Sequence, residues 1–191
     1  ANAISDVITD RGFKYTFRTN AKSSYNAKNA IDFVIDVGNK TGIKVNTVAF
    51  VYEDTSVGIS TATNLKKYIT GTGLKVVLDE PYPHGRTDAT PLATKVKAAN
   101  PDAVIFISYL SDLILITKAY KALNFSPKGF VYVGGGATID PAFIKAMGKD
   151  AENIITVSAW TLDIKTPWAP TLISEVNKNY KATWGEDMSY N

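Results

Sequence analysis

The sequence predicts a doubly wound α/β fold, in which an open parallel sheet carries helices on both faces. Short and almost continuous apolar runs, such as those at 47–51 and 103–107, are typical of strands that are covered on both sides. Between such runs lie segments of about 10 to 15 residues whose apolar positions recur at helical spacing. Strands that alternate with helices predict right-handed crossovers and therefore a parallel sheet.

The first expected elements are a strand at 14–18 and a helix at 23–39. Residues 14–18 alternate between polar and apolar side chains, as a strand with one buried face does. The apolar positions of the helix share one face; they are Ala27, Ala30, Ile31, Val34 and Ile35. Gly38 and Gly42 flank the expected end of this helix. Glycine is common there because it adopts without strain the left-handed conformation just past a helix.

Residues 46–52 form the next expected strand, because this apolar run suits a strand covered on both faces. A helix at 58–69 follows, and Gly71-Thr72-Gly73 stops it before a strand at 74–78. The loop at 80–88 is rich in helix breakers. The helix after this loop has Asp88 or Thr90 as its cap and Pro91 in its first turn, and it ends near Asn100.

The remaining elements continue the alternation. The expected strands cover 103–107, 130–133 and 154–157. The expected helices cover 111–123, 141–147 and 168–184. Pro170 near the start and Gly185 beyond the end support the last of these helices.

Length and composition predict a single globular domain that covers residues 1–191. Of these 191 residues 45% are hydrophobic and 20% are charged, which is the ordinary balance of a globular protein. The 21 basic and 18 acidic residues form no basic stripe, so we expect no nucleic-acid partner. Apolar runs fall far short of the roughly 20 residues that span a bilayer, so we expect no direct membrane insertion. The chain has no cysteine, which excludes disulfides and thiolate metal sites.

Ligands of open parallel sheets bind beyond the carboxyl ends of the strands, where helix amino termini and backbone amides converge. The loops expected there span 52–58, 108–112, 134–138 and 158–161, and they are rich in hydroxyl, aromatic and glycine residues. Such loops can hydrogen-bond a carboxylate and cover an apolar group with an aromatic ring. The candidate ligand-binding residues are Ser56, Val57, Tyr109, Asp112, Gly135, Gly136 and Trp160.

Most of these candidates also have a purely structural explanation. Ser56 suits a helix cap, Tyr109 and Trp160 suit packing, and the glycines suit turns. Their coincidence across four loops favours ligand binding.

Motifs of several enzyme classes are absent from the sequence. The triple glycine at 134–136 lacks the G-x-G-x-x-G spacing, and neither a phosphate loop nor a G-x-S-x-G nucleophile elbow occurs. His84 is the only histidine, and without a second histidine or a cysteine it does not predict a transition-metal site or a serine triad. Glu53 and Asp54 could hold Mg²⁺, but turn formation and capping explain them more simply. We therefore expect no metal, no cofactor and no enzymatic activity.

Several strand-end motifs together resemble the type I periplasmic binding proteins, in particular the Leu/Ile/Val-binding branch that serves ABC transporters. The motifs are Phe17-Arg18-Thr19, Val51 through Gly58, Tyr82 through Gly85 with Asp88, Asn100 through Val104, Gly134-Gly135-Gly136, and Pro141-Ala142-Phe143 leading to Gly148. The resemblance covers nearly the whole chain. It implies one α/β lobe of a bilobed protein, similar to the second, C-terminal lobe, with the first lobe largely absent.

The resemblance further implies an extracytoplasmic solute-binding component of an ABC importer. Such a protein binds an amino acid or a related small carboxylate by hinge closure between its two lobes and then docks on a membrane permease. The expected location is periplasmic or extracellular, with a lipid anchor as an option for the full-length protein. In this lobe the resemblance nominates the loop around Ser56 and Val57, Tyr109, the backbone around Gly136, and Trp160.

Two positions depart from the branched-chain pattern that the resemblance implies. Relatives carry an aromatic residue where Val57 stands, and a carboxylate that can pair with the ligand ammonium near the position of Gly136. A buried ammonium without a countercharge is costly. Three alternatives follow: Asp112 or Asp54 substitutes for the carboxylate, the first lobe supplies it, or the ligand is not an α-amino acid.

Two other functions share this architecture. One is the ligand-sensing domain of a receptor or a transcriptional regulator, which differs in what is fused to it. The other is a nucleotide-using α/β enzyme, suggested by the glycine cluster and the neighbouring acids at 53 and 54.

Overall fold

A computed structural model describes residues 3–134, 136–158 and 161–188. Its centre is a five-stranded, wholly parallel sheet with the strand order β2-β1-β3-β4-β5. The strands are β1 (Thr47–Glu53), β2 (Lys75–Tyr82), β3 (Ala103–Ile107), β4 (Gly129–Val133) and β5 (Ile154–Val157). This arrangement confirms the predicted doubly wound α/β fold.

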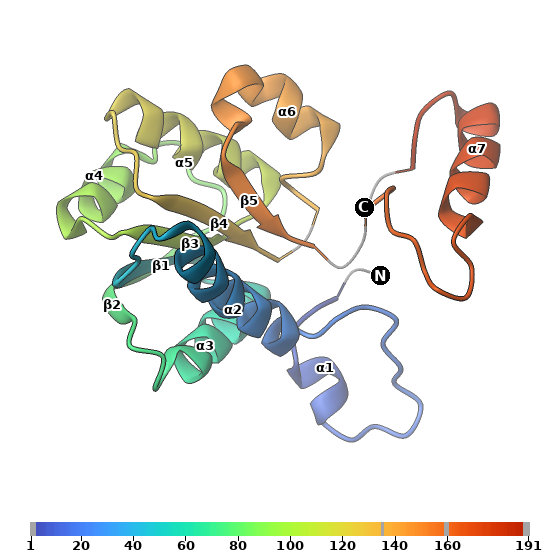
Figure 1. Ribbon diagram of the computed structural model, residues 1–191, viewed down its shortest axis with the longest axis horizontal. Coiled ribbons are helices and arrows are strands. Elements are labelled where there is room, and N and C mark those ends of the chain that lie inside the picture. Colours follow the sequence, from blue (N-terminus) through green and yellow to red (C-terminus); the bar gives the residue numbers. More distant parts are fainter. Residues whose placement is uncertain (1–2, 135, 159–160, 189–191) are drawn as a thin grey trace.

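Helices cover both faces of the sheet (Figure 1). The helices of the chain are α1 (Val7–Asp10), α2 (Ser23–Thr41), α3 (Ser56–Ile69), α4 (Thr90–Ala99), α5 (Leu110–Ala122), α6 (Pro141–Met147), the 3₁₀ helix η1 (Gly148–Ala151) and α7 (Leu172–Trp184). Helices α2 and α3 pack on one face, and α4, α5 and α6 pack on the other.

The alternation of side chains along β1 shows why both faces are apolar. Val48, Phe50 and Tyr52 point into the core under α2 and α3. Ala49 and Val51 point into the core under α4 and α5. Because successive side chains of a strand point to opposite faces, a strand covered on both faces must be apolar throughout.

The expected strand at 14–18 is wrong. In the structure these residues form a turn and an irregular loop, and no strand of the described residues lies beside them. Tyr15 and Phe17 are 81% and 83% exposed, so their alternation is not matched by a buried face. Arg18 is fixed by its guanidinium, which donates to the carbonyl oxygens of Ala3 at 2.6 Å and Ser5 at 2.5 Å.

The boundaries of further elements also differ from those expected, and three of these differences are informative. Helix α3 begins at Ser56, because the Thr55 hydroxyl accepts a hydrogen bond from Gly58 N and caps the helix. Helix α7 begins at Leu172, four residues later than expected. Strand β2 runs on through Pro81, which an edge strand tolerates because its outer side needs no hydrogen bond.

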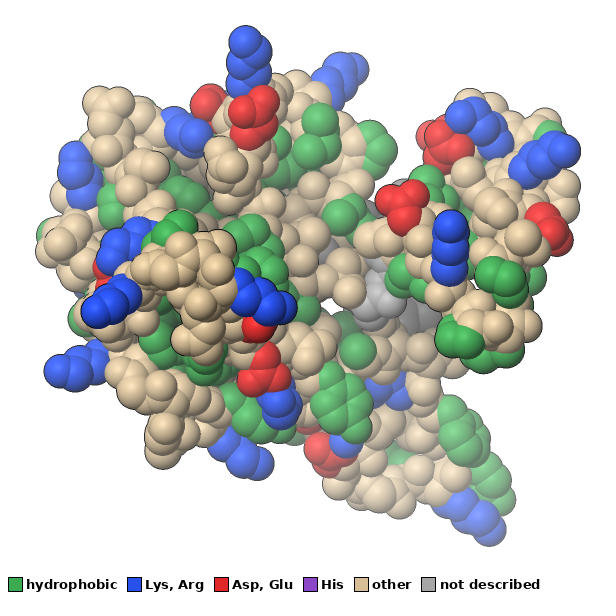
Figure 2. All heavy atoms as spheres, in the orientation of Figure 1, with side chains coloured by type: hydrophobic (Ala, Val, Ile, Leu, Met, Phe, Trp, Pro, Cys, Tyr) green, Lys and Arg blue, Asp and Glu red, His purple; other side chains and the backbone are tan. Residues whose placement is uncertain are grey.

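Helix α7 stands apart from the sheet in Figure 1, and none of its residues is buried. A second exposed apolar region is the loop at 11–18, which projects from the body of the molecule and carries Phe13, Tyr15 and Phe17 (Figure 2). The buried core of the described chain therefore lies around the sheet, and these two segments add little to it.

Candidate functional site

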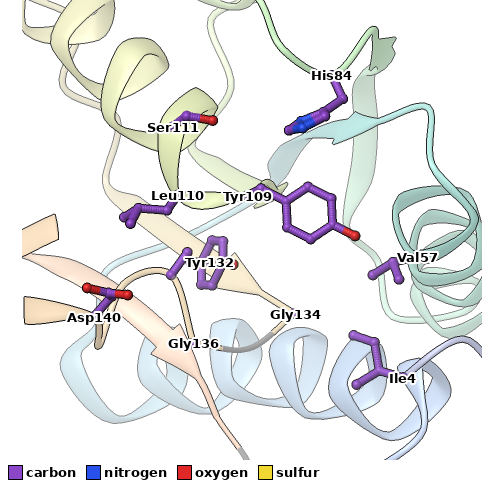
Figure 3. A pocket seen from close by; sticks show the side chains of 11 residues that line it. Ile4, Val57, His84, Tyr109, Leu110, Ser111, Tyr132, Gly134, Gly136 and Asp140 are labelled. Carbon is purple, nitrogen blue, oxygen red and sulfur yellow. The ribbon is translucent and has the colours of Figure 1, made fainter. Parts of the chain in front are cut away.

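The candidate site is a pocket of about 720 Å³ at the carboxyl ends of β1, β3 and β4 (Figure 3). Its position follows from the parallel sheet, because all strand ends and the amino termini of the following helices meet at this edge. The pocket is lined by Ile4, Val57, His84, Tyr109, Leu110, Ser111, Tyr132, Gly134, Gly136, Ala137 and Asp140.

The structure brings three of the sequence-predicted site residues together in this pocket: Val57, Tyr109 and Gly136. Ser56 is exposed at the start of α3 and is not among the lining residues. Asp112 is 1% exposed and lies behind the pocket wall. The predictions for Gly135 and Trp160 concern positions that lie outside the described residues.

Tyr109 projects its ring into the pocket and is held by its backbone (Figure 3). Its backbone N–H donates to Glu53 Oε1 at the end of β1, and its carbonyl oxygen accepts from the Ser108 hydroxyl at 3.1 Å. Ser108 is itself held by two buried phenols, since Tyr82 OH donates to its Oγ at 2.7 Å and Tyr132 OH donates to its carbonyl oxygen at 2.8 Å. The amino terminus of α5 is therefore fixed by neighbouring strands.

Glu53, His84 and Asp112 form a polar cluster behind Tyr109. His84 Nδ1 lies 3.1 Å from Asp112 Oδ2 and 3.6 Å from Glu53 Oε1. Asp112 Oδ2 also accepts from Gly85 N at 2.9 Å. The edge of the His84 ring meets the Tyr109 ring with 5.1 Å between centroids.

Burial raises the pKa of Glu53, and the nearby Asp112 carboxylate acts in the same direction. The hydrogen bond from Tyr109 N and the proximity of His84 oppose this rise. The neighbouring acids Glu53 and Asp54 lie in different surroundings. Glu53 is 2% exposed, whereas Asp54 lies at the surface.

The loop from β1 to α3 is tight enough to require a glycine. A Cβ atom on Gly58 would lie 1.9 Å from the carbonyl oxygen of Glu53. Gly58 thus lets the first turn of α3 pack directly against the strand end that carries Glu53.

A family model for periplasmic binding proteins matches residues 3–190. The chain belongs to this family. The resemblance stated from the strand-end motifs is therefore confirmed.

Among curated relatives, the Leu/Ile/Val-binding protein homolog 8 of Brucella abortus (strain 2308) is 29% identical over 187 residues. The match covers 96% of this chain and 46% of the relative, so the chain spans about half the length of the curated relatives it matches. Solved structures of the same fold include a fatty acid ABC transporter substrate-binding protein from Thermomonospora curvata, with a TM-score of 0.76 and 17% identity, covering 92% of this chain and 43% of that one. A further one is a solute binding protein of an ABC transporter from Rhodopseudomonas palustris BisB5 in complex with 3,4-dihydroxy benzoic acid, with a TM-score of 0.76 and 19% identity, covering 98% of this chain and 49% of that one.

Glu53, His84 and Asp112 also form the one group in the described ranges whose side chains place three metal-ligand atoms within 4.8 Å of one another. Glu53 Oε1, His84 Nδ1 and Asp112 Oδ2 already take part in hydrogen bonds or ion pairs of the protein. We therefore describe the cluster as a hydrogen-bonded network. The structure describes residues 3–134, 136–158 and 161–188, and no helix in these ranges is long and apolar enough to cross a bilayer.

Four residues of the pocket wall lie outside the loops that the sequence predicts: Ile4, His84, Tyr132 and Asp140. Ile4 comes from the segment before α1, which carries no motif, and Arg18 holds that segment in place. His84 was assigned no role because it has no second histidine, but it follows β2 directly at the ligand-binding edge of the sheet. Its position after a strand was the signal that could have identified it.

Proposed function

We propose that the chain forms the second lobe of a bilobed solute-binding protein that serves an ABC importer. The observation that carries this proposal is the pocket at the carboxyl ends of three neighbouring strands, where Val57 and Tyr109 supply apolar surface and Gly136 leaves room for a ligand beside the backbone. The proposed activity is binding and not catalysis, since the chain belongs to the periplasmic binding protein family and the pocket is a concave, partly apolar surface.

The proposed solute is an amino acid or a related small carboxylate. The names of the relatives support this class, since one is a Leu/Ile/Val-binding protein homolog, one a fatty acid transporter component and one a complex with a dihydroxybenzoic acid. Asp112 does not reach the pocket directly, because its Oδ2 lies behind His84 and Gly85. A ligand ammonium, if there is one, would therefore be paired by Asp140, which lines the pocket, or by the other lobe.

The proposed mechanism is hinge closure, in which the solute bridges this lobe and the first lobe and stabilises the closed form that a membrane permease recognises. The exposed aromatic residues of the 11–18 loop and the apolar side chains of α7 support a contact with the first lobe, because surfaces of this kind are usually covered. The proposed location is periplasmic or extracellular, and a lipid anchor on the full-length protein is compatible with it.

The pocket can be tested in this chain by amide NMR titration with L-leucine and with sodium benzoate. We expect shifts at Val57 and Gly136 with affinities in the millimolar range, because half of the enclosing contacts are missing. ATP serves as a negative probe. Tyr109→Ser should weaken binding, whereas Tyr15→Ser, which removes an 81% exposed ring, should leave binding unchanged.

Two results would count against the proposal. If saturating probe moves no pocket amide, or moves only residues far from the pocket, the pocket is not a solute site. Micromolar binding to this chain alone would contradict the claim that closure with a second lobe supplies the affinity.

A further inference from the structure

His84 stands on the rim of the pocket, in the loop that follows β2 (Figure 3). It is the only histidine in the sequence, and its side chain is 47% exposed, so a ligand in the pocket can reach it. Nothing in the proposed function uses this residue.

The two carboxylates behind His84 are almost completely removed from water. Glu53 is 2% and Asp112 is 1% exposed, and in the described part of the chain each has an ion pair only with His84. Burying carboxylates is costly unless they are paired and hydrogen-bonded. Backbone N–H groups of Tyr109 and Gly85 supply hydrogen bonds, and the His84 imidazole is the side chain that contacts both carboxylates.

The contacts of the imidazole ring leave one nitrogen for a ligand. Nδ1 faces the two carboxylates at 3.1 and 3.6 Å. The ring edge against Tyr109, at an interplanar angle of 73°, fixes the ring plane. The two ring nitrogens point in different directions, and Nε2 has no hydrogen-bond partner among the residues that the structure describes.

Among the described residues that line the pocket there is no lysine or arginine, so His84 is the one of them whose side chain can carry a positive charge toward an anionic group of a solute. Asp140 is the one carboxylate of the wall, and it caps α6 by accepting from Ala142 N at 2.8 Å.

We propose that His84 is a ligand-contacting residue and that its Nε2–H binds a carboxylate of the solute while Asp112 and Glu53 hold the ring from behind. This inference rests on the proposed function, since it assigns one contact within the same pocket. Charged hydrogen bonds of this kind are stronger than neutral ones, so the contact would select solutes with a carboxylate.

The assignment predicts that binding is coupled to a proton. A carboxylate that binds the imidazolium form stabilises that form, so its affinity should fall as the pH rises and the proton is lost. The groups that face His84 are Glu53 from β1, Asp112 from α5 and the Tyr109 ring before α5, and the nearby guanidinium of Arg86 lies over the Tyr82 ring.

Three probes with similar branched apolar groups distinguish a carboxylate contact from an ammonium contact. The probe 4-methylpentanoate has only the carboxylate, 3-methylbutylamine has only the ammonium, and L-leucine has both. Because the chain has one histidine, its ring signals in an NMR spectrum belong to His84 without further assignment. We expect 4-methylpentanoate and L-leucine to shift these signals toward the imidazolium form at constant pH. The amine should not do so.

The variant His84→Gln keeps a polar side chain but removes the charge. We expect it to weaken 4-methylpentanoate binding by about tenfold and to abolish its pH dependence, while amine binding stays within about twofold. If this variant does not fold, the wild-type ring signals still decide the matter.

Two outcomes would overturn the inference. If 4-methylpentanoate moves the amides of Val57 and Gly136 but leaves the His84 ring unmoved, the pocket binds solute and only the histidine contact is refuted. If no probe moves any pocket signal, the proposed function fails and the histidine contact fails with it.

Discussion

Asp102 should contribute about 2 kcal/mol to the stability of the fold from the end of the sheet opposite the pocket. Its Oδ2 accepts from the backbone N–H groups of Asn46 and Thr47 at 2.8 and 3.0 Å, and its Oδ1 pairs with Lys128 at 2.6 Å. Burial alone would raise the pKa of Asp102, but the pair with Lys128 and these backbone donors outweigh it and lower the pKa from 3.8 to about 2. One pKa unit corresponds to about 1.4 kcal/mol, so the difference amounts to roughly 2.5 kcal/mol at neutral pH.

The substitution Asp102→Asn tests this value, because asparagine imitates the protonated acid in size and retains an acceptor. A folded-state pKa below the unfolded value stabilises the protein above pH 3.8 and loses this effect as the pH falls toward 2. Urea unfolding should therefore show the variant about 2 kcal/mol less stable than wild type at pH 7, with the difference shrinking from pH 4 downward. The control is Asp36→Asn, which removes an exposed pair with Lys40 within α2 and should cost at most about 0.5 kcal/mol.

The reasoning about Asp102 would be refuted if Asp102→Asn and wild type had equal stability at pH 7. It would also be refuted if a difference seen at pH 7 stayed constant down to pH 3, because the loss would then come from packing and not from charge. Comparing the two variants at both pH values separates these cases.

Three further substitutions test the contacts around the pocket. Gly58→Ala should lower the stability by about 1 to 3 kcal/mol in urea unfolding, since its Cβ would meet the Glu53 carbonyl oxygen, whereas Gly71→Ser places a side chain in open space and should cost only the strain of its positive φ. Glu53→Gln should remove a pH dependence of the free energy of unfolding. Because burial raises the pKa of Glu53, wild type should lose stability as the pH rises above 4.5 through the folded pKa, and the variant should not. Arg18→Ala should release the segment that carries Ile4, which hydrogen exchange of the backbone at 4–10 would detect as lost protection, with Arg18→Lys giving a partial effect.

The strands that sequence reasoning located correctly are those whose signal is an apolar run. Residues 103–107 and 130–133 are buried on both faces or nearly so, and burial on both faces needs no alternation to be recognised. The strand expected at 14–18 rested on alternation alone. Alternation describes one chain segment, but a strand also needs a neighbour to accept its hydrogen bonds, and the described residues offer none there.

The candidate site was predictable in its position but not in its chemistry. Val57, Tyr109 and Gly136 follow from the rule that ligands bind at the carboxyl ends of parallel strands. The cluster of Glu53, His84 and Asp112 depends on the strand order β2-β1-β3, which places the ends of three strands side by side. Sequence order alone does not give that adjacency, so the sequence indicates no joint role for Glu53, His84 and Asp112.

The two ends of the sheet satisfy their buried polar groups in different ways, and this difference separates stability from binding. At the amino end, Asp102 pairs with Lys128 and accepts from backbone N–H groups, so its partners all come from within the chain. At the carboxyl end, the partner of the buried acids is a half-exposed imidazole on the pocket rim. Asp102→Asn should therefore lower stability while the solute affinity of the folded protein stays unchanged. His84→Gln should lower the carboxylate affinity of the folded protein about tenfold. If both variants changed affinity equally, the pocket geometry would depend on the whole sheet, and the assignment of a separate contact to His84 would lose its support.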